Sequence, residues 1–324
     1  MSALLTEFEL IKEIKKRLSY GKDVIKGIGD DCAVIKKNGV YQLYTIDNMV
    51  ENVHFDFKIQ KKFENIGFKA VSRAISDIVA MGGTPKFILV SLAISKSLDE
   101  TGFHKIATGI KTACKYYKTD LIGGDITKSA TTTVTVAVIG ECNTKPIFRS
   151  GATIGDNIYV TGSLGLAAAG LALLKAKKEA PKKLVDAYEK PVVQVALGNA
   201  LRERNIATSM IDISDGLLGD LNHILEESKK GAVLELKSLP ISKLLKSTFS
   251  KKDYTQFILN GGDDYKLLFT ANEGQDSQIS LISKQFKTPI TKIGKIIKNG
   301  FFMAENDKVT EITPNSYQHS FTFY

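Results

Sequence analysis

Aspartates that follow apolar runs are the residues of this chain whose type and spacing could do chemistry. Three of them, Asp212, Asp215 and Asp220, lie within MIDISDGLLGD. Carboxylates this close raise one another's pKa unless a cation neutralises them. Magnesium binds one or two carboxylates and leaves its other positions to phosphate oxygens and water. The same apolar-then-Asp pattern recurs at Asp30, Asp31, Asp47, Asp77, Asp125, Asp263 and Asp264. The recurrence predicts several Mg²⁺ ions that hold a polyphosphate.

Each aspartate also has a simpler interpretation. Asp31 is typical of a turn or cap residue. Asp77 could pair with Arg73 on a helix surface, because residues four apart share one face of a helix. Asp212 could cap the helix that follows it, and Asp220 is expected to face solvent. A single Asp-Gly turn is weak support, so the hypothesis of a metal–phosphate site depends on the recurrence of the pattern.

Strands alternate with helices along the chain, which predicts a mixed α/β fold. The first helix has a capping-box pattern at Thr6 and Glu9. Gly82 and Gly83 are expected to stop a long helix. The helices are expected over 65–83, 99–117, 163–177, 192–205 and 216–230. The strands are expected over 40–47 (ending in Asp47), 86–94 (a buried strand), 119–125 (with a glycine turn before Asp125), 131–141, 157–162, 231–236, 265–270 and 290–297.

Length and composition predict a globular protein of two domains. A chain of 324 residues exceeds the size at which one hydrophobic core keeps growing. The boundary is expected near FRSGATIGD, which gives an N-terminal domain over 1–148 and a C-terminal domain over 149–324. No apolar run is long enough to span a membrane, so no membrane partner is expected.

The net charge and the cysteines bear on partners and location. The net charge is +9, but the lysines come in pairs spread along the chain without interleaved aromatics. This pattern favours a solvated lysine-rich surface and no nucleic-acid partner. The chain has three cysteines, Cys32, Cys114 and Cys142, an odd number without paired spacing. We therefore expect reduced thiols and a cytoplasmic location.

Standard nucleotide-binding and hydrolase motifs are missing from the sequence. There is no GxxxxGK[ST] sequence, which excludes a P-loop. The glycines of VTGSLGLAAAGLALL, which are Gly162, Gly165 and Gly170, do not fit GxGxxG, and a packing role is the better interpretation. The four histidines form no recognisable Ser-His-Asp arrangement. Any nucleotide is therefore expected to bind through the aspartate-held metals.

Seven motifs, in the same order along nearly the whole chain, resemble those of the thiamine-monophosphate kinase family. They are GIGDDCAVI, TIDNMVENVHF, SDIVAMGG, LIGGDIT, RSGATIGDNIYVTGSLG, IDISDGLLGDL and GGDDYKLLFT. Single motifs such as SDIVAMGG are shared with the wider aminoimidazole ribonucleotide synthetase superfamily. The resemblance implies the two-domain fold of that superfamily and a homodimer in which the N-terminal sheets pair into a barrel. It also implies ATP-dependent phosphorylation of thiamine monophosphate to thiamine diphosphate.

The resemblance also implies roles for individual residues. Magnesium ligands are implied at Asp30, Thr45, Asp47, Asp77, Asp125, Asp212 and Asp215. Of these, Asp77, Asp212 and Asp215 are the expected catalytic group. Contacts with ATP are implied for Gly124, Arg149 and Ser214, and contacts with thiamine monophosphate for His54, Asp263 and Tyr317. These roles suit phosphoryl transfer to a phosphate, because two anions must approach and several cations must neutralise them.

The sequence departs from the family pattern at a few positions. Ile46 and Asn48 stand where the family usually has Thr, and Asp263 and Lys266 stand where it has Glu. Two other functions stay open. One is another ATP-using enzyme of the same superfamily with a different acceptor. The other is a nucleotide-binding module without catalytic turnover.

Overall fold

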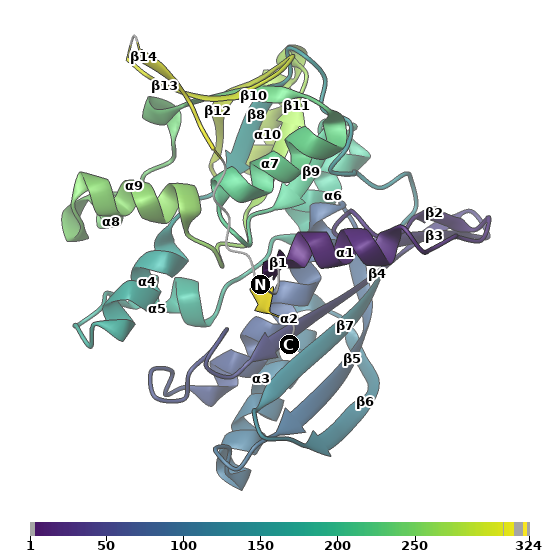
Figure 1. The fold of residues 1–324 in the computed structure, drawn as a ribbon, viewed down its shortest axis with the longest axis vertical. Helices are drawn as coiled ribbons and strands as arrows, with labels where there is room; N and C mark the ends of the chain where they lie inside the picture. Colours follow the sequence, from purple (N-terminus) through teal and green to yellow (C-terminus); the bar gives the residue numbers. More distant parts are fainter. Residues whose placement is uncertain (1–3, 307, 314–319, 323–324) are drawn as a thin grey trace.

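The computed structural model of this protein describes residues 4–306, 308–313 and 320–322 (Figure 1). It has two large β-sheets with helices packed on them and one two-stranded sheet, which confirms the predicted mixed α/β class. The two ends of the chain meet, because β1 (Leu4–Thr6) pairs antiparallel with β15 (Ser320–Thr322). Helix α1 (Glu7–Lys15) follows β1 and has the expected capping box between Thr6 and Glu9. Within the described residues no helix has the length and apolar character needed to cross a membrane.

The first sheet has six strands in the order β2-β3-β4-β7-β5-β6. All neighbours are antiparallel except β5 and β6, which are parallel. The strands are β2 (Val24–Lys26), β3 (Ala33–Lys37), β4 (Val40–Val50), β5 (Thr84–Ile94), β6 (Asp120–Lys128) and β7 (Thr133–Cys142). Helices α2 (Phe63–Ala80) and α3 (Glu100–Tyr117) cover one face of this sheet (Figure 1).

Two glycines let α2 and α3 approach each other closely. A Cβ on Gly67 of α2 would lie 2.1 Å from the carbonyl oxygen of Ile106, and one on Gly109 of α3 would lie 1.9 Å from that of Glu64. Real side chains do not tolerate such distances, so each glycine is needed for the helix pair. The pair in turn fixes the face of α2 that points toward the sheet.

The other face of the six-stranded sheet carries exposed apolar side chains. The expectation of a buried strand over 86–94 is therefore wrong, because β5 is buried on its helix side and partly open on the other, where Phe87 and Leu89 lie. Ile46 on β4 is 70% exposed and lies in the same row as Leu89, because both pair with Ala137 of β7. Large exposed apolar patches mark interaction surfaces.

The second sheet has seven strands in the order β14-β13-β10-β12-β8-β11-β9. The strands are β8 (Asn157–Thr161), β9 (Ser209–Asp212), β10 (Gly231–Glu235), β11 (Leu267–Ala271), β12 (Ile290–Ile297), β13 (Phe301–Glu305) and β14 (Lys308–Glu311). Its helices are α4 (Leu166–Lys175), α5 (Lys182–Glu189), α6 (Val195–Glu203), α7 (Leu217–Ser228), α8 (Lys243–Thr248), α9 (Lys251–Asn260) and α10 (Asp276–Gln285). Short 3₁₀ turns cover Leu236–Ser238 and Glu273–Gln275.

Alternate residues of the central strands enter two different cores. On β11, Phe269 joins the core that also contains α2, α6 and α10, whereas Leu268 joins the core beneath α4, α7 and α9. The first core therefore runs from the six-stranded sheet to the seven-stranded one. The division at 148/149 falls between β7 and β8 and stays a prediction, because buried side chains of both parts pack together across it.

Two expected strand ends lie elsewhere. Strand β4 continues to Val50, so Asp47 lies inside the strand and not at its end. Strand β6 is continuous through Gly123 and Gly124, so no glycine turn precedes Asp125. Gly124 pairs with Val90 of β5, and a Cβ on it would lie 1.8 Å from the Val90 carbonyl oxygen. Strand pairing alone thus explains this glycine.

Candidate active site

A cavity of about 810 Å³ lies between the two sheets and is lined by residues of both. Its walls come from β4, α2, α4, α5 and β9 and from the segments after β9 and α9. Seven residues with roles implied by the sequence line it: Asp47, His54, Asp77, Asp212, Ser214, Asp215 and Asp263. The fold therefore brings together carboxylates that are up to about two hundred positions apart in the chain.

Strand β4 and helix α2 match each other in spacing. Two residues along a strand and four along a helix both span about 6–7 Å. Thr45 and Asp47 therefore meet Asp77 and Arg73, respectively. The Thr45 hydroxyl donates to Asp77 Oδ2 at 2.5 Å, and Arg73 donates to both oxygens of Asp47 at 2.8 and 3.1 Å. The expected surface pair between Asp77 and Arg73 is wrong, because Arg73 pairs across to β4.

Asp31, Asp77 and Asp212 form a carboxylate cluster. One oxygen from each lies within 4.8 Å of the others. Ser76 donates to Asp212 Oδ2 at 2.5 Å. Asp31 Oδ2 is buried and has no hydrogen-bond partner among the residues that the structure describes. An orphaned buried carboxylate oxygen beside two further carboxylates fits a hard divalent cation such as Mg²⁺.

Burial and mutual repulsion raise the pKa values of these carboxyls. Burial, followed by repulsion from Asp31, raises the pKa of Asp212 to about 7. Burial and then Asp212 raise the pKa of Asp77 well above its ordinary value. Burial raises the pKa of Asp215 to about 6, and burial with Asp31 raises that of Asp30 to about 6. The group therefore favours either protons or a bound cation at neutral pH.

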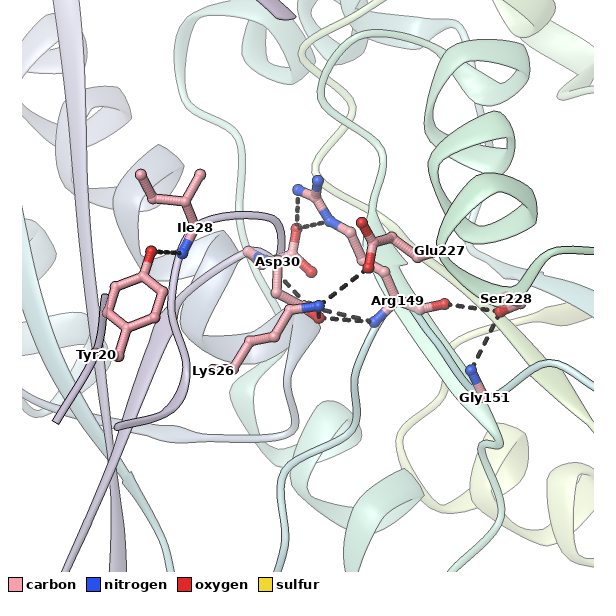
Figure 2. Close-up of polar contacts among 9 residues, drawn as sticks. Tyr20, Lys26, Ile28, Asp30, Arg149, Gly151, Glu227 and Ser228 are labelled. Atoms are coloured by element: carbon pink, nitrogen blue, oxygen red, sulfur yellow. Dashed lines mark hydrogen bonds and ion pairs between the residues drawn. The ribbon is translucent and has the colours of Figure 1, made fainter. Parts of the chain in front are cut away.

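Basic side chains border this cluster, and Figure 2 shows two of them, Lys26 and Arg149, beside Asp30. Arg149 donates from Nη2 to Asp31 Oδ1 at 2.7 Å, and its backbone N–H donates to Asp30 at 3.2 Å. Lys26 lies 3.5 Å from Asp30 and 3.0 Å from Glu227 of α7. These contacts tie the loop before β3 to the second sheet. Asp31 lies in the bend between β2 and β3, where a turn residue was expected, and its side chain is a buried ion-pair partner of Arg149.

Asp220 holds the loop after β9 in place. Its Oδ2 accepts the backbone N–H groups of Ser214, Asp215 and Gly216 at 3.0, 3.1 and 3.1 Å. The side chain is 1% exposed, so the expectation that it faces solvent is wrong. Asp212 points to Ser76 and does not cap the following helix. The fixed loop presents Ser214 and Asp215 to the cavity.

The far part of the cavity contains a second charged group, centred on Asp263. The fully buried Lys69 of α2 contacts Asp263 Oδ2 at 2.7 Å, and the Tyr265 hydroxyl donates to Oδ1 at 2.5 Å. The Lys69 ammonium also lies 3.9 Å from the centre of the Tyr188 ring. Burial alone would raise the pKa of Asp263, but Lys69 and Arg73 outweigh it and lower the pKa. Asp263 is therefore an oriented carboxylate.

His54 lies in the turn after β4. Its Nδ1 accepts the backbone N–H of Val50 at 3.0 Å, which fixes the orientation of the ring. Val50, Val53 and Leu171 line the cavity beside it. This part of the cavity offers apolar surface and an aromatic ring, in contrast to the carboxylate cluster.

The structure does not bring every sequence-predicted residue together. Asp125 pairs with Ser91 in a row of the sheet that continues to Asn48, about 14 Å away over three strand spacings. Paired residues share one face, and Asn48 lies on the face of β4 opposite Asp47. Asp125 is exposed there, away from the cluster. Gly124 pairs with Val90 in the row that continues to Asp47, so it lies on the face of Asp47 but also three strand spacings away. Tyr317 lies outside the described residues.

Comparisons with known proteins identify the family. Residues 29–142 match the model of the AIR synthase related protein, N-terminal domain, and residues 153–302 match that of the AIR synthase related protein, C-terminal domain. A thiamine-monophosphate kinase of Buchnera aphidicola is 38% identical over 97% of this chain and 98% of its own length. That of Haemophilus influenzae is 38% identical over 90% and 89%. The chain belongs to the thiamine-monophosphate kinase family. The resemblance seen in the sequence and the superfamily fold are thereby confirmed.

A solved structure of the family agrees with this assignment. The structure described as AaThiL complexed with AMPPCP and TMP superposes with a TM-score of 0.85 at 32% identity, and the match covers 97% of each chain. A thiamine-monophosphate kinase from Stenotrophomonas maltophilia superposes with a TM-score of 0.77 at 30% identity.

The sequence interpretation missed four residues of the site. Lys69 and Arg73 precede Asp77 at intervals of four on α2, so three charged side chains share one face of an otherwise apolar helix. This spacing could have placed both in the cavity. Ser76 and Asp220 carry no comparable signal, because their partners are distant carboxylate and backbone groups that only the fold brings near.

Proposed function

We propose that this chain transfers a phosphoryl group from ATP to thiamine monophosphate and so forms thiamine diphosphate. Membership of the family supports this activity, and the carboxylate cluster carries the structural argument. Asp31, Asp77 and Asp212 converge within 4.8 Å at one side of a cavity that also has an apolar and aromatic side. A site of this composition suits a metal-bound polyphosphate next to an acceptor with a ring system.

The cluster and its neighbours would hold magnesium and the phosphates of ATP. We infer that Asp77 and Asp212 bind the cation, with Asp30, Asp31, Asp47 and Asp215 close enough to assist. Magnesium, when bound, would neutralise charge on the phosphate oxygens. Arg149 offers a planar guanidinium beside Asp31, and such a group suits phosphate oxygens. The Asp220-fixed loop presents Ser214 to the same region.

The opposite part of the cavity would receive thiamine monophosphate. Val50, Val53 and Leu171 offer apolar contact for its rings, together with the Tyr188 ring. His54 and Asp263 face this part and would orient the substrate. Arg73 lies between Asp47 and Asp263, where its guanidinium would attract the acceptor phosphate.

Transfer would proceed directly between the two substrates. The acceptor phosphate is largely ionised at neutral pH, with a second pKa of about 6, so it needs no general base. Catalysis then reduces to alignment and charge neutralisation. The His54 Nδ1 is already engaged with backbone, which suits an orienting role. No covalent phosphoenzyme is required.

A homodimer would cover the exposed apolar face of the six-stranded sheet, which carries Ile46, Phe87 and Leu89. We expect Ile46→Glu to yield monomers in analytical ultracentrifugation. Ile154→Glu is the matched control, because Ile154 is 60% exposed on the other part of the molecule. A dimer that survives Ile46→Glu and a substitution of Leu89 would place the interface elsewhere. If the dimer forms through this face, Gly124 and Asp125 would act on ATP or metal only in the partner's site.

The direct test is a coupled assay of ADP formation with thiamine monophosphate, thiamine and an unrelated phosphate monoester as acceptors. We expect turnover with thiamine monophosphate, its loss in chelator and its recovery with Mg²⁺, with Ca²⁺ a poor substitute because of its larger coordination shell. Turnover only with another acceptor would indicate a different enzyme of the superfamily. ATP binding without turnover would indicate a binding module.

A further inference from the structure

A second, smaller cavity of about 180 Å³ lies beside the first and shares only Tyr265 with it. Its walls are the end of β8 at Thr161 and Gly162, the segment 192–194 before α6, and the segment 287–289 after α10. None of the residues with a predicted role in phosphoryl transfer lines this cavity. Its volume is below the about 300–1,000 Å³ of sites for drug-sized ligands, so any occupant must be small.

Lys266 is a half-buried cation in the wall of this cavity. Its carbon chain passes Gly162, where a Cβ would lie 3.3 Å from Lys266 Cδ. Burial lowers the pKa of the ammonium, and Asp264 only partly offsets this. Within residues 4–306, 308–313 and 320–322, the ammonium has no hydrogen-bond or ion-pair partner. Lys266 is only half-buried, so its ammonium keeps contact with solvent in the cavity and is accessible to a counter-anion that enters it.

The nearest carboxylate, Asp264, is not free to serve as that counter-ion. It is buried, and its oxygens accept the backbone N–H groups of Gly165 at 2.5 Å and Ala167 at 3.4 Å. These contacts direct the carboxylate toward the start of α4. The Lys266 ammonium can therefore pair with an anion that enters the cavity. The sequence also departs from the family pattern here, which has Glu at this position, and Glu would repel an anion.

A second ammonium group lines the same cavity. Lys287 is held by its left-handed backbone, with φ +50°, immediately after α10. The described part of the chain offers it no ion-pair partner either. Lys287 is exposed and stands where the cavity opens to solvent, whereas Val192, Val193 and Leu197 form an apolar wall. Two lysines acting as point charges in so small a space fit a compact dianion.

We propose that this second cavity binds a small phosphate anion, with Lys266 as its main counter-charge and Lys287 at its rim. Inorganic phosphate and the phosphate end of a small ester share this chemistry. The inference does not depend on the proposed kinase activity, because it concerns a separate cavity and a ligand whose binding is measured without turnover.

The test is calorimetric titration of the full chain with inorganic phosphate, in chelator, without nucleotide and at constant ionic strength. We expect saturable binding by the wild type and at least about a tenfold loss of affinity in Lys266→Met, since one charge-assisted contact is worth about that factor. Lys287→Met should lose less. Lys298→Met is the matched control, because Lys298 is exposed outside the cavity, and it should bind phosphate like the wild type.

Two further experiments complete the test. One separates binding in this cavity from binding in the larger cavity, and the other separates free phosphate from a phosphate ester. Arg73→Gln changes the larger cavity and should leave phosphate affinity intact. Affinity lost in Arg73→Gln but kept in Lys266→Met, or equal affinity in all variants, would overturn the proposal. Titration with glycerol phosphate separates the sources: weaker binding than that of phosphate supports free phosphate, and tighter binding supports an ester. Thermal unfolding checks folding, since phosphate should raise the Tm of the wild type but not that of Lys266→Met.

Discussion

Single side chains in this site are held by partners that prepare them for charge. Asp212 accepts from Ser76, Asp77 accepts from Thr45, and Asp31 is paired with Arg149. Each carboxylate keeps at least one oxygen near the other two. The clustering that seemed costly in the sequence is a preorganised cation site, because the repulsion disappears when a cation and phosphates bind.

Asp212→Asn should therefore reduce kcat by about two or more orders of magnitude, which is a loss of a few kcal/mol of transition-state stabilisation. The fold should survive, and its stability in the absence of metal should rise, because the mutation removes a buried charge that two carboxylates repel. Steady-state kinetics and urea unfolding measure the two effects. Asp23→Asn, at an exposed position, is the control. Normal turnover of Asp212→Asn would mean that the cluster has only a structural role.

At the scale of elements, helix α2 organises the cavity. Lys69, Arg73 and Asp77 are spaced four residues apart on α2. Successive turns of the helix therefore present an ammonium, a guanidinium and a carboxylate on one face. Asp77 faces the carboxylate cluster, Arg73 faces Asp47, and Lys69 faces Asp263. The helix thus lies across both the nucleotide part and the acceptor part of the proposed site.

Arg73→Met should weaken the binding of thiamine monophosphate more than the binding of ATP. Its guanidinium lies beside Asp47 and near Asp263, so we expect the KM for thiamine monophosphate to rise at least about tenfold, as for the loss of one charge-assisted contact. The KM for ATP should change far less. Arg17→Met, at an exposed arginine, is the control. Equal increases in both KM values would place Arg73 at the nucleotide.

The sequence was sufficient to predict the elements and much of the site, because periodicity and turn residues are local. Helix α2 and its stop at Gly82 were predicted in this way. The burial of Asp220 was not, since it depends on three backbone N–H groups that the fold of a neighbouring loop aims at it. The pairing of Arg73 with Asp47 was also missed, because only the packing of α2 on the sheet brings these two residues together. Tertiary packing decides such contacts, and it is not local.

At the scale of the whole molecule, the cavity exists because two sheets share one hydrophobic core. Lys26 and Arg149 tie the N-terminal loop to the second part through ion pairs with Glu227 and Asp31 (Figure 2). Carboxyls with raised pKa values are concentrated at this junction. The stability of the molecule should therefore depend on pH through the site itself.

The metal-free protein should be less stable at about pH 8 than at about pH 5. Asp212 has a folded pKa of about 7, and Asp30 and Asp215 of about 6, whereas the ordinary value is 3.8. The folded state then binds more protons than the unfolded state between these values, so stability is lost as pH rises through them. Urea unfolding in chelator measures this, and Asp212→Asn should flatten the slope. Stability that rises over this range would contradict the pKa shifts.

Label transfer from γ-³²P-labelled ATP tests the central claim most directly. The protein is incubated with labelled ATP, Mg²⁺ and thiamine monophosphate, and the products and the protein are separated. The account predicts label in thiamine diphosphate, labelling slower by about two or more orders of magnitude in Asp212→Asn reactions, and no label on the protein when thiamine monophosphate is omitted. Labelled protein formed from ATP alone would contradict direct transfer. Unlabelled thiamine diphosphate, or no thiamine diphosphate from a folded protein in Mg²⁺, would contradict the assignment of this cavity as a phosphoryl-transfer site.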